Sequence, residues 1–150
     1  GRTIQSVAVA SIYMACRQCG VIRTLEDVAG AANITKKEAA RNYRFLLREL
    51  KPSVPQVNPR GYISKIVNKL ALSGETERLA MSILNQASEM KLTSGRGPSG
   101  IAAACIYISS QLTDERRTQG EIAKEAQVTE VTIRNRYKEL AQRLDFCVTI

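Results

Sequence analysis

The sequence predicts an all-α fold built from two tandem copies of one helical repeat. Apolar residues recur at the three- and four-residue spacing of helices, and no segment alternates convincingly with period two. When the chain is shifted by 94 residues, residues 1–50 fall on 95–144 without a gap, with 14 identities in 50 pairs. A period of this length exceeds that of solenoid units and therefore indicates two copies of one domain.

The first repeat, residues 1–51, is predicted to contain three helices. The first covers residues 3–18 and is apolar enough to be buried. Thr24 caps the second helix, and Thr35-x-x-Glu38 is a capping box for the third. Three prolines then follow within eight residues of Lys51, so residues 52–58 are predicted to be the linker between the repeats.

The second repeat, residues 59–150, is predicted to contain five helices. Asn58 and Pro59 begin the first, expected over 58–72, and Ser73-Gly74 ends it before a second helix over 74–92. The third, over 98–112, is small or apolar on nearly every face, which is typical of a central buried helix. Thr118 and Thr129 begin the last two helices, whose spacing is that of a helix-turn-helix.

The two copies are unequal. In the second, helix 98–112 is expected to be covered by two apolar stripes, Ile63/Ile66/Leu70 and Leu79/Ile83/Met90. The first copy has no counterpart of these two helices, so the simplest interpretation is a fragment whose first repeat lacks its first two helices. Helix 3–18 would then expose apolar residues. We expect residues 1–50 either to be poorly ordered or to gain cover from another chain. The apolar residues in question are Val7, Val9, Ile12 and Met14.

The composition indicates a globular protein with a polyanionic partner. Hydrophobic residues make up 44% of the 150 residues, and 22 Lys and Arg against 14 Asp and Glu give a net charge of +8. A basic balance of this kind is typical of nucleic-acid binding. The absence of His excludes His-based triads. Since no phosphate loop or paired acidic site stands out either, we expect no enzyme activity, no cofactor and no small-molecule substrate.

The cysteines indicate free thiols rather than a metal site. Cys16 and Cys19 form a C-x-x-C, which is half of a structural zinc site, and neither a second pair nor a His completes it. Cys105 and Cys147 stand alone. We therefore expect no bound metal and a reducing compartment. No signal peptide or long apolar run is present, which predicts an intracellular protein with no membrane partner.

The last helices of the two copies carry different side chains in their first turns. The first copy offers Lys36, Lys37 and Arg41, which suit phosphates or an acidic protein. The second offers a set suited to base edges and to the thymine methyl group. Its members are Val131, Thr132, Arg134, Asn135 and Arg136. A solvated helix face is the alternative interpretation for the arginines of this set.

Three runs in the second repeat carry a resemblance to a known family. They are Gly95-Arg96-x-Pro98-x-x-Ile-Ala-Ala-Ala-x-Ile-Tyr107, Arg116-Arg-Thr-Gln-x-Glu-Ile-Ala123 and Val128-Thr-Glu-Val-Thr-Ile-Arg-Asn-Arg-Tyr137. Together with residues 8–17 and Thr35-Lys-Lys-Glu38, they make essentially the whole chain similar to the cyclin-like repeats of transcription initiation factor B. This family comprises archaeal factor B and eukaryotic TFIIB, and Arg116-Arg-Thr-Gln119 is closer to the archaeal branch.

The resemblance implies a general transcription initiation factor. Such a factor binds the TATA-binding protein on promoter DNA, reads an upstream element through the second helix-turn-helix and helps to recruit RNA polymerase. It would act in the cytoplasm of an archaeon or the nucleus of a eukaryote. The alternative is a cyclin-like interaction module that regulates a partner enzyme, which would not need Arg134, Asn135 and Arg136 on one helix start.

The resemblance also implies residue roles. Val131 and Arg134 would contact bases, with Thr132, Asn135 and Arg136 beside them. Gly1 and Arg2 would approach DNA downstream of the TATA box, and Arg96 would contact a phosphate. Further candidates for phosphate or partner contacts are Lys36, Lys37, Arg41 and Arg117.

Overall fold

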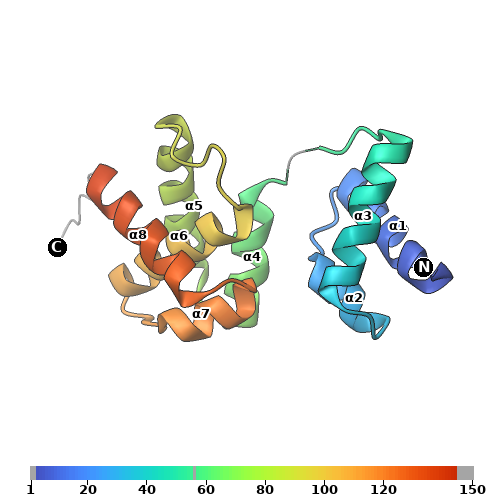
Figure 1. Ribbon diagram of the computed structural model, residues 1–150. Coiled ribbons are helices and arrows are strands. Elements are labelled where there is room, and N and C mark those ends of the chain that lie inside the picture. The colour runs from blue at the N-terminus through green and yellow to red at the C-terminus, as the bar shows by residue number, and fades with distance from the viewer. Residues whose placement is uncertain (1–2, 56, 145–150) are drawn as a thin grey trace. The chain divides into compact units, whose positions relative to one another are not determined.

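The computed structural model describes residues 3–55 and 57–144, and every regular element in this part of the chain is a helix (Figure 1). The helices are α1 (Ile4–Gln18), α2 (Leu25–Ala31), α3 (Lys36–Leu50), α4 (Pro59–Lys69), α5 (Gly74–Glu89), α6 (Pro98–Leu112), α7 (Gln119–Ala126) and α8 (Glu130–Arg143). The predicted all-α fold is confirmed. The chain divides into two compact units, Gly1–Val57 and Asn58–Ile150. None of the described helices is long and apolar enough to span a membrane.

The first unit packs α1, α2 and α3 against one another. Its core consists of two small clusters, Val9 with Ala29 and Ala39, and Ala10 with Met14 and Leu46. The expectation that α1 lies uncovered is therefore wrong for Val9 and Met14, which α2 and α3 bury. It is confirmed for Ile12, which is 55% exposed on the other side of the helix. Ile4, which was not part of the expectation, is 92% exposed.

The end of the first unit is held to α1 by two side chains. Arg17 donates a hydrogen bond of 2.9 Å to the carbonyl oxygen of Pro55, and Gln18 donates one of 3.5 Å to that of Ser53. Tyr43 packs beside this arginine. Burial raises the pKa of the Tyr43 phenol, although the charge of Arg17 opposes the shift. Part of the segment predicted as a linker thus belongs to the first unit.

The second unit is built around α6. This helix buries ten of its 15 residues and contacts α4, α5, α7 and α8. Ile63, Ile66 and Ile83 are buried as the stripes predict, whereas Met90 is 51% exposed and its prediction is wrong. Leu84 and Ala87 are the residues of α5 that are buried near its end. By contrast, α1 buries four of its 15 residues among the described part of the first unit.

Two predicted helix ends differ from the structure. α4 ends at Lys69 rather than at 72, and α5 ends at Glu89 rather than at 92. Ala71 and Lys91 adopt left-handed φ angles of 49° and 58°, which an α-helix cannot continue. Ser73, predicted to end a helix, instead caps the start of α5 by accepting a hydrogen bond from the amide of Thr76.

A second interaction fixes the start of α5. The carboxylate of Glu115 accepts hydrogen bonds from the amide of Ser73, at 3.1 and 3.2 Å, and from the Ser73 hydroxyl at 2.7 Å. It also accepts one from the hydroxyl of Thr76. These bonds, that from Thr76 foremost, hold the pKa of Glu115 below its usual value.

The two repeats correspond in structure as well as in sequence. Thr24 and Thr118 both form capping boxes, with Asp27 and Glu121 respectively. The turn before the last helix passes through a left-handed residue in each, Asn33 (φ 52°) and Gln127 (φ 55°). Tyrosine pairs also match, since the ring centroids of Tyr13 and Tyr43, and of Tyr107 and Tyr137, are 4.9 Å apart. The same scaffold is therefore used twice.

Candidate nucleic-acid interface

α7 and α8 form a helix-turn-helix whose geometry is fixed by local hydrogen bonds. The amide of Glu121 donates a 3.2 Å hydrogen bond to the Thr118 hydroxyl. In return the Glu121 carboxylate accepts hydrogen bonds of 2.7 Å from the amide and the hydroxyl of Thr118, which hold the pKa of Glu121 below its usual value. Thr129 caps α8 by accepting a 3.2 Å hydrogen bond from the amide of Thr132. Buried Ile122 and Ile133 then pack the two helices into the unit. The start of α8 is therefore held by a helix cap and by a buried side chain.

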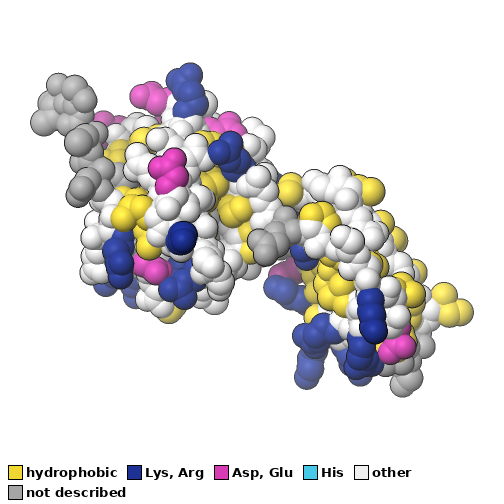
Figure 2. Space-filling model, turned by 90° about the horizontal axis from the view of Figure 1, so that it is seen from above, with side chains coloured by type: hydrophobic (Ala, Val, Ile, Leu, Met, Phe, Trp, Pro, Cys, Tyr) yellow, Lys and Arg dark blue, Asp and Glu magenta, His cyan; other side chains and the backbone are white. Residues whose placement is uncertain are grey.

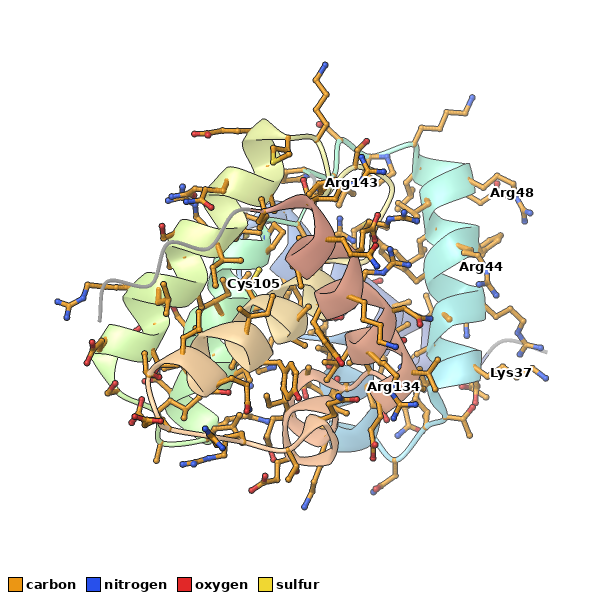
Figure 3. All side chains as sticks on the ribbon, turned by 90° about the vertical axis from the view of Figure 1, so that its left-hand side faces the viewer. Lys37, Arg44, Arg48, Cys105, Arg134 and Arg143 are labelled. Atoms are coloured by element: carbon orange, nitrogen blue, oxygen red, sulfur yellow. The ribbon has the colours of Figure 1, made fainter. Side chains whose placement is uncertain are left out.

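The outer face of α8 carries the residues predicted to meet bases. Val131 is 58% exposed, and Arg134 and Asn135 are exposed, whereas Ile133 between them is fully buried. Arg134 lies in the first turns of α8 (Figure 3). Lys138, one turn further, is also exposed. The sequence analysis missed Lys138, although its four-residue spacing from Arg134 places both on one face.

Thr132 serves the scaffold rather than the outer face. Its hydroxyl lies 2.9 Å from that of Thr129, and its γ-methyl lies 3.0 Å from the point where a Cβ on Gly100 would be. Any side chain at Gly100 would press against it. The start of α8 therefore touches the start of α6 directly, and the predicted base contact by Thr132 stays a prediction.

Arg96 and Arg136 share one carboxylate. Both donate hydrogen bonds to Glu139, at 3.0 and 2.5 Å, and the side chain of Arg136 is only 24% exposed. Partial burial alone would raise the pKa of Glu139, but the bonds and charges of the two arginines outweigh it and hold the pKa below its usual value. A DNA phosphate would have to compete with Glu139 for either guanidinium group. The predicted DNA contacts of Arg96 and Arg136 therefore require an ion pair with Glu139 to be broken or shared.

The remaining predicted cations are placed differently from one another. Arg117 donates a 3.2 Å hydrogen bond to the carbonyl oxygen of Leu70, the C-cap residue of α4. Lys36 forms an ion pair of 2.8 Å with Glu26. Lys37 and Arg41 are exposed on α3. The predicted contacts by Gly1 and Arg2 lie outside the described residues.

The three described cysteines differ in how exposed their thiols are. Cys19 is exposed, Cys16 is half-buried, and Cys105 is buried in α6, where burial raises the pKa of its thiol to about 12. In the stretches 3–55 and 57–144, no three Cys, Asp or Glu side chains gather where they could hold a metal ion. Cys147 lies outside the described residues.

Comparison with known proteins decides the family. The family model described as "Transcription factor TFIIB repeat" matches residues 1–49 and 52–143. The chain belongs to the TFIIB repeat family. The eight described helices, three in the first unit and five in the second, agree with tandem cyclin-like repeats of this family. Its transcription factors are not enzymes, and the alternative of a module regulating a partner enzyme is not favoured.

This TFIIB-repeat chain is similar to several curated proteins named Transcription initiation factor IIB. It is 54% identical to Transcription initiation factor IIB of Methanosphaerula palustris over 145 residues, which are 97% of the chain and 43% of that protein. Its identity to the protein of the same name from Methanocaldococcus jannaschii is 54%, over the whole chain and 22% of that protein. The corresponding protein of Methanococcus maripaludis is 53% identical, over the whole chain and 44% of its own length. The chain thus spans less than half the length of these curated relatives.

Proposed function

We propose that this chain acts in general transcription initiation by binding promoter DNA together with the TATA-binding protein, and that it helps to recruit RNA polymerase. In this proposal α8 enters the major groove upstream of the TATA box. The family and the relatives named Transcription initiation factor IIB support the general role. The base-reading role of α8 is supported by the arrangement of its first turns.

The observation that carries the proposal is the exposure of Val131. A valine that is 58% exposed beside exposed Arg134 and Asn135 loses apolar contact in water, whereas in a major groove it can pack on a thymine methyl group. Arg134 can donate two parallel hydrogen bonds to one guanine, and Asn135 can pair with an adenine edge. The capped and buried inner side of α8 keeps these groups in position.

The test is a gel-shift titration on TATA promoter DNA, with and without TATA-binding protein, comparing an intact with a scrambled upstream sequence. Arg134→Ala should weaken binding to the intact site by about 5- to 150-fold more than to the scrambled site, because one bidentate base contact discriminates by about 1–3 kcal/mol. Arg143→Ala, at the exposed far end of α8, is the matched control and should leave the ratio unchanged. Equal losses on both DNAs would reassign Arg134 to phosphate binding.

A further inference from the structure

A C-x-x-C pair lies at the carboxyl end of α1 and takes no part in the proposed function. Cys16 is half-buried and Cys19 is exposed. Residues three apart on a helix are neighbours on one face, and helix geometry places their Cα atoms about 5 Å apart. This separation is within the range of about 4.4–6.8 Å that a disulfide requires. The two thiols can therefore reach each other within one helical turn.

The end of α1 is a turn that can adjust to such a bond. Cys19 is the C-cap residue, and Gly20 after it adopts a left-handed φ of 69°. The amide of Val21 donates a 2.8 Å hydrogen bond to the carbonyl oxygen of Cys16. A Cβ on Gly20 would meet no atom within 4 Å beyond its chain neighbours, so the turn is surrounded by open space. Cys19 thus lies where helical geometry ends, and a small change of its position leaves the rest of α1 in place.

The scaffold does not require thiols at these two positions. At the 94-residue offset they correspond to Ser110 and Thr113, and Thr113 is the C-cap of α6 as Cys19 is of α1. Both hydroxyls donate hydrogen bonds to carbonyl oxygens of α6, Ser110 at 2.9 Å and Thr113 at 3.0 Å. An oxygen therefore fits where each sulfur stands, and the thiols give the first copy a chemistry that the second copy lacks.

The turn between the two cysteines also carries the attachment of residues 53–55. Arg17 and Gln18, the two residues between them, donate hydrogen bonds to the carbonyl oxygens of Pro55 and Ser53. This attachment is slight, since the Gln18 bond is 3.5 Å long and, over residues 3–55 and 57–144, the buried Nε of Arg17 has no hydrogen-bond partner. A disulfide holds its Cβ atoms about 3.8 Å apart, whereas Cβ atoms three residues apart on a helix are separated by about 5–6 Å. Closing the bond therefore displaces one end of the turn by about 1–2 Å, and the hydrogen bonds of Arg17 and Gln18 shift with it.

We propose that Cys16 and Cys19 form a reversible disulfide and that this bond loosens the attachment of residues 53–55 to α1. The oxidant is a disulfide of a small thiol. The exposed Cys19 thiolate attacks one of its sulfurs and releases the first small thiol, and the Cys16 thiolate then attacks the Cys19 sulfur of the mixed disulfide and releases the second. The two cysteines lose two electrons and two protons, which the small disulfide takes up, and an added dithiol reverses the reaction. The proposal is independent of DNA binding by either unit.

The surface of the first unit suits an anionic disulfide. Residues 3–55 carry eight Lys and Arg against four Asp and Glu. Lys and Arg side chains gather along one side of this unit (Figure 2). Oxidised glutathione carries a net negative charge at pH 8 and is attracted to a cationic surface. It is therefore the probe for the test.

The first test incubates the whole chain with oxidised glutathione at pH 8, alkylates the remaining thiols and digests the product with trypsin without reduction. Because trypsin cleaves after Arg17, the disulfide should link peptides 3–17 and 18–23, while the intact monomer loses the mass of two hydrogen atoms. Dithiothreitol should restore both thiols. Cys16→Ser and Cys19→Ser should each abolish the link, whereas Cys147→Ser should keep it.

The second test measures the attachment of residues 53–55 by the rate at which thermolysin cleaves within residues 52–58, on gel-filtered reduced and oxidised chains. Oxidation should speed cleavage about 2- to 10-fold, the factor that corresponds to one ordinary hydrogen bond. Cys19→Ser retains Arg17 and Gln18 and is the matched control, which should be cleaved at one rate with and without prior oxidation. Arg17→Ala should be cleaved at the faster rate before any oxidation.

Several results would overturn the proposal. A covalent dimer through Cys19, or a stable glutathione adduct on Cys19 with Cys16 still free, would show that the two thiols do not reach each other. A link from Cys19 to the peptide that holds Cys147 would assign the oxidation to another pair. Equal cleavage of the reduced and oxidised chains would remove the effect on residues 53–55. Discrimination by Arg134 is measured on DNA, which neither test contains, so either proposal can fail alone.

Discussion

Ile133→Ala tests whether the start of α8 is fixed by burial. Ile133 has no exposed surface, and it sits two residues after exposed Val131 on the same helix. The substitution removes three carbons. At about 0.8 kcal/mol per buried carbon the transfer contribution is about 2.4 kcal/mol, and the cavity left behind brings the total to about 2–5 kcal/mol. Val131→Ala removes two carbons from an exposed position and should change the free energy of unfolding by at most about 0.5 kcal/mol.

The assay is amide hydrogen exchange of the slowest α6 amides, which report on unfolding of the second unit alone. A urea titration followed by circular dichroism serves as a check on the whole chain. Val131→Ala should in turn lower discrimination between intact and scrambled upstream DNA while leaving exchange unchanged. The reasoning is refuted if Ile133→Ala costs less than about 1 kcal/mol, or if Val131→Ala destabilises the unit as much as Ile133→Ala does.

Three other predictions follow from the first and second units. Glu115→Gln should destabilise the second unit above pH 4.5, and the difference from the unchanged chain should vanish as pH falls below that value. The reason is that the lowered native pKa makes the carboxylate stabilising only when it is ionised. Urea midpoints measured from pH 3 to 7 check this, and a difference that is constant with pH contradicts it. Cys19 should be alkylated within minutes at pH 8 while Cys105 reacts only on unfolding, as mass-mapped labelling would show; rapid labelling of Cys105 would contradict its burial. The exposed face of α1 should make the chain self-associate or leave α1 poorly protected, so a monomer by light scattering with strong amide protection over residues 4–18 would disprove it.

The beginnings of the helices could be predicted from the sequence because they are set locally. Thr24, Thr35, Thr118 and Thr129 each cap a helix in the structure. Thr35 accepts a hydrogen bond from the Glu38 amide, but the reciprocal bond of the predicted capping box is not formed there. The ends of α4 and α5 could not be predicted in this way. Ala71 and Lys91 adopt left-handed φ angles there, although neither is the glycine that usually marks such a helix end.

The candidate site could be predicted only in part. The exposed triad of Val131, Arg134 and Asn135 follows from helical periodicity. The sharing of Glu139 by Arg96 and Arg136 does not, because Arg96 lies 43 residues away and is brought close by tertiary packing. Likewise, Met90 fits the apolar stripe of α5 by spacing, but it is the C-cap residue of that helix, directly before left-handed Lys91, and it is exposed.

The paired scaffolds have a consequence for how such a protein can change. Asn33 and Gln127 turn the chain at the same place, and the Thr24 and Thr118 boxes start the preceding helix in the same way. None of these contacts involves the outer face of α3 or α8. After a duplication, a few substitutions of outward-facing residues can therefore give each copy its own ligand, while the helix caps and turns that determine the fold stay the same. The same independence predicts that the outward residues of α3 and α8 can be exchanged by protein engineering without loss of the fold.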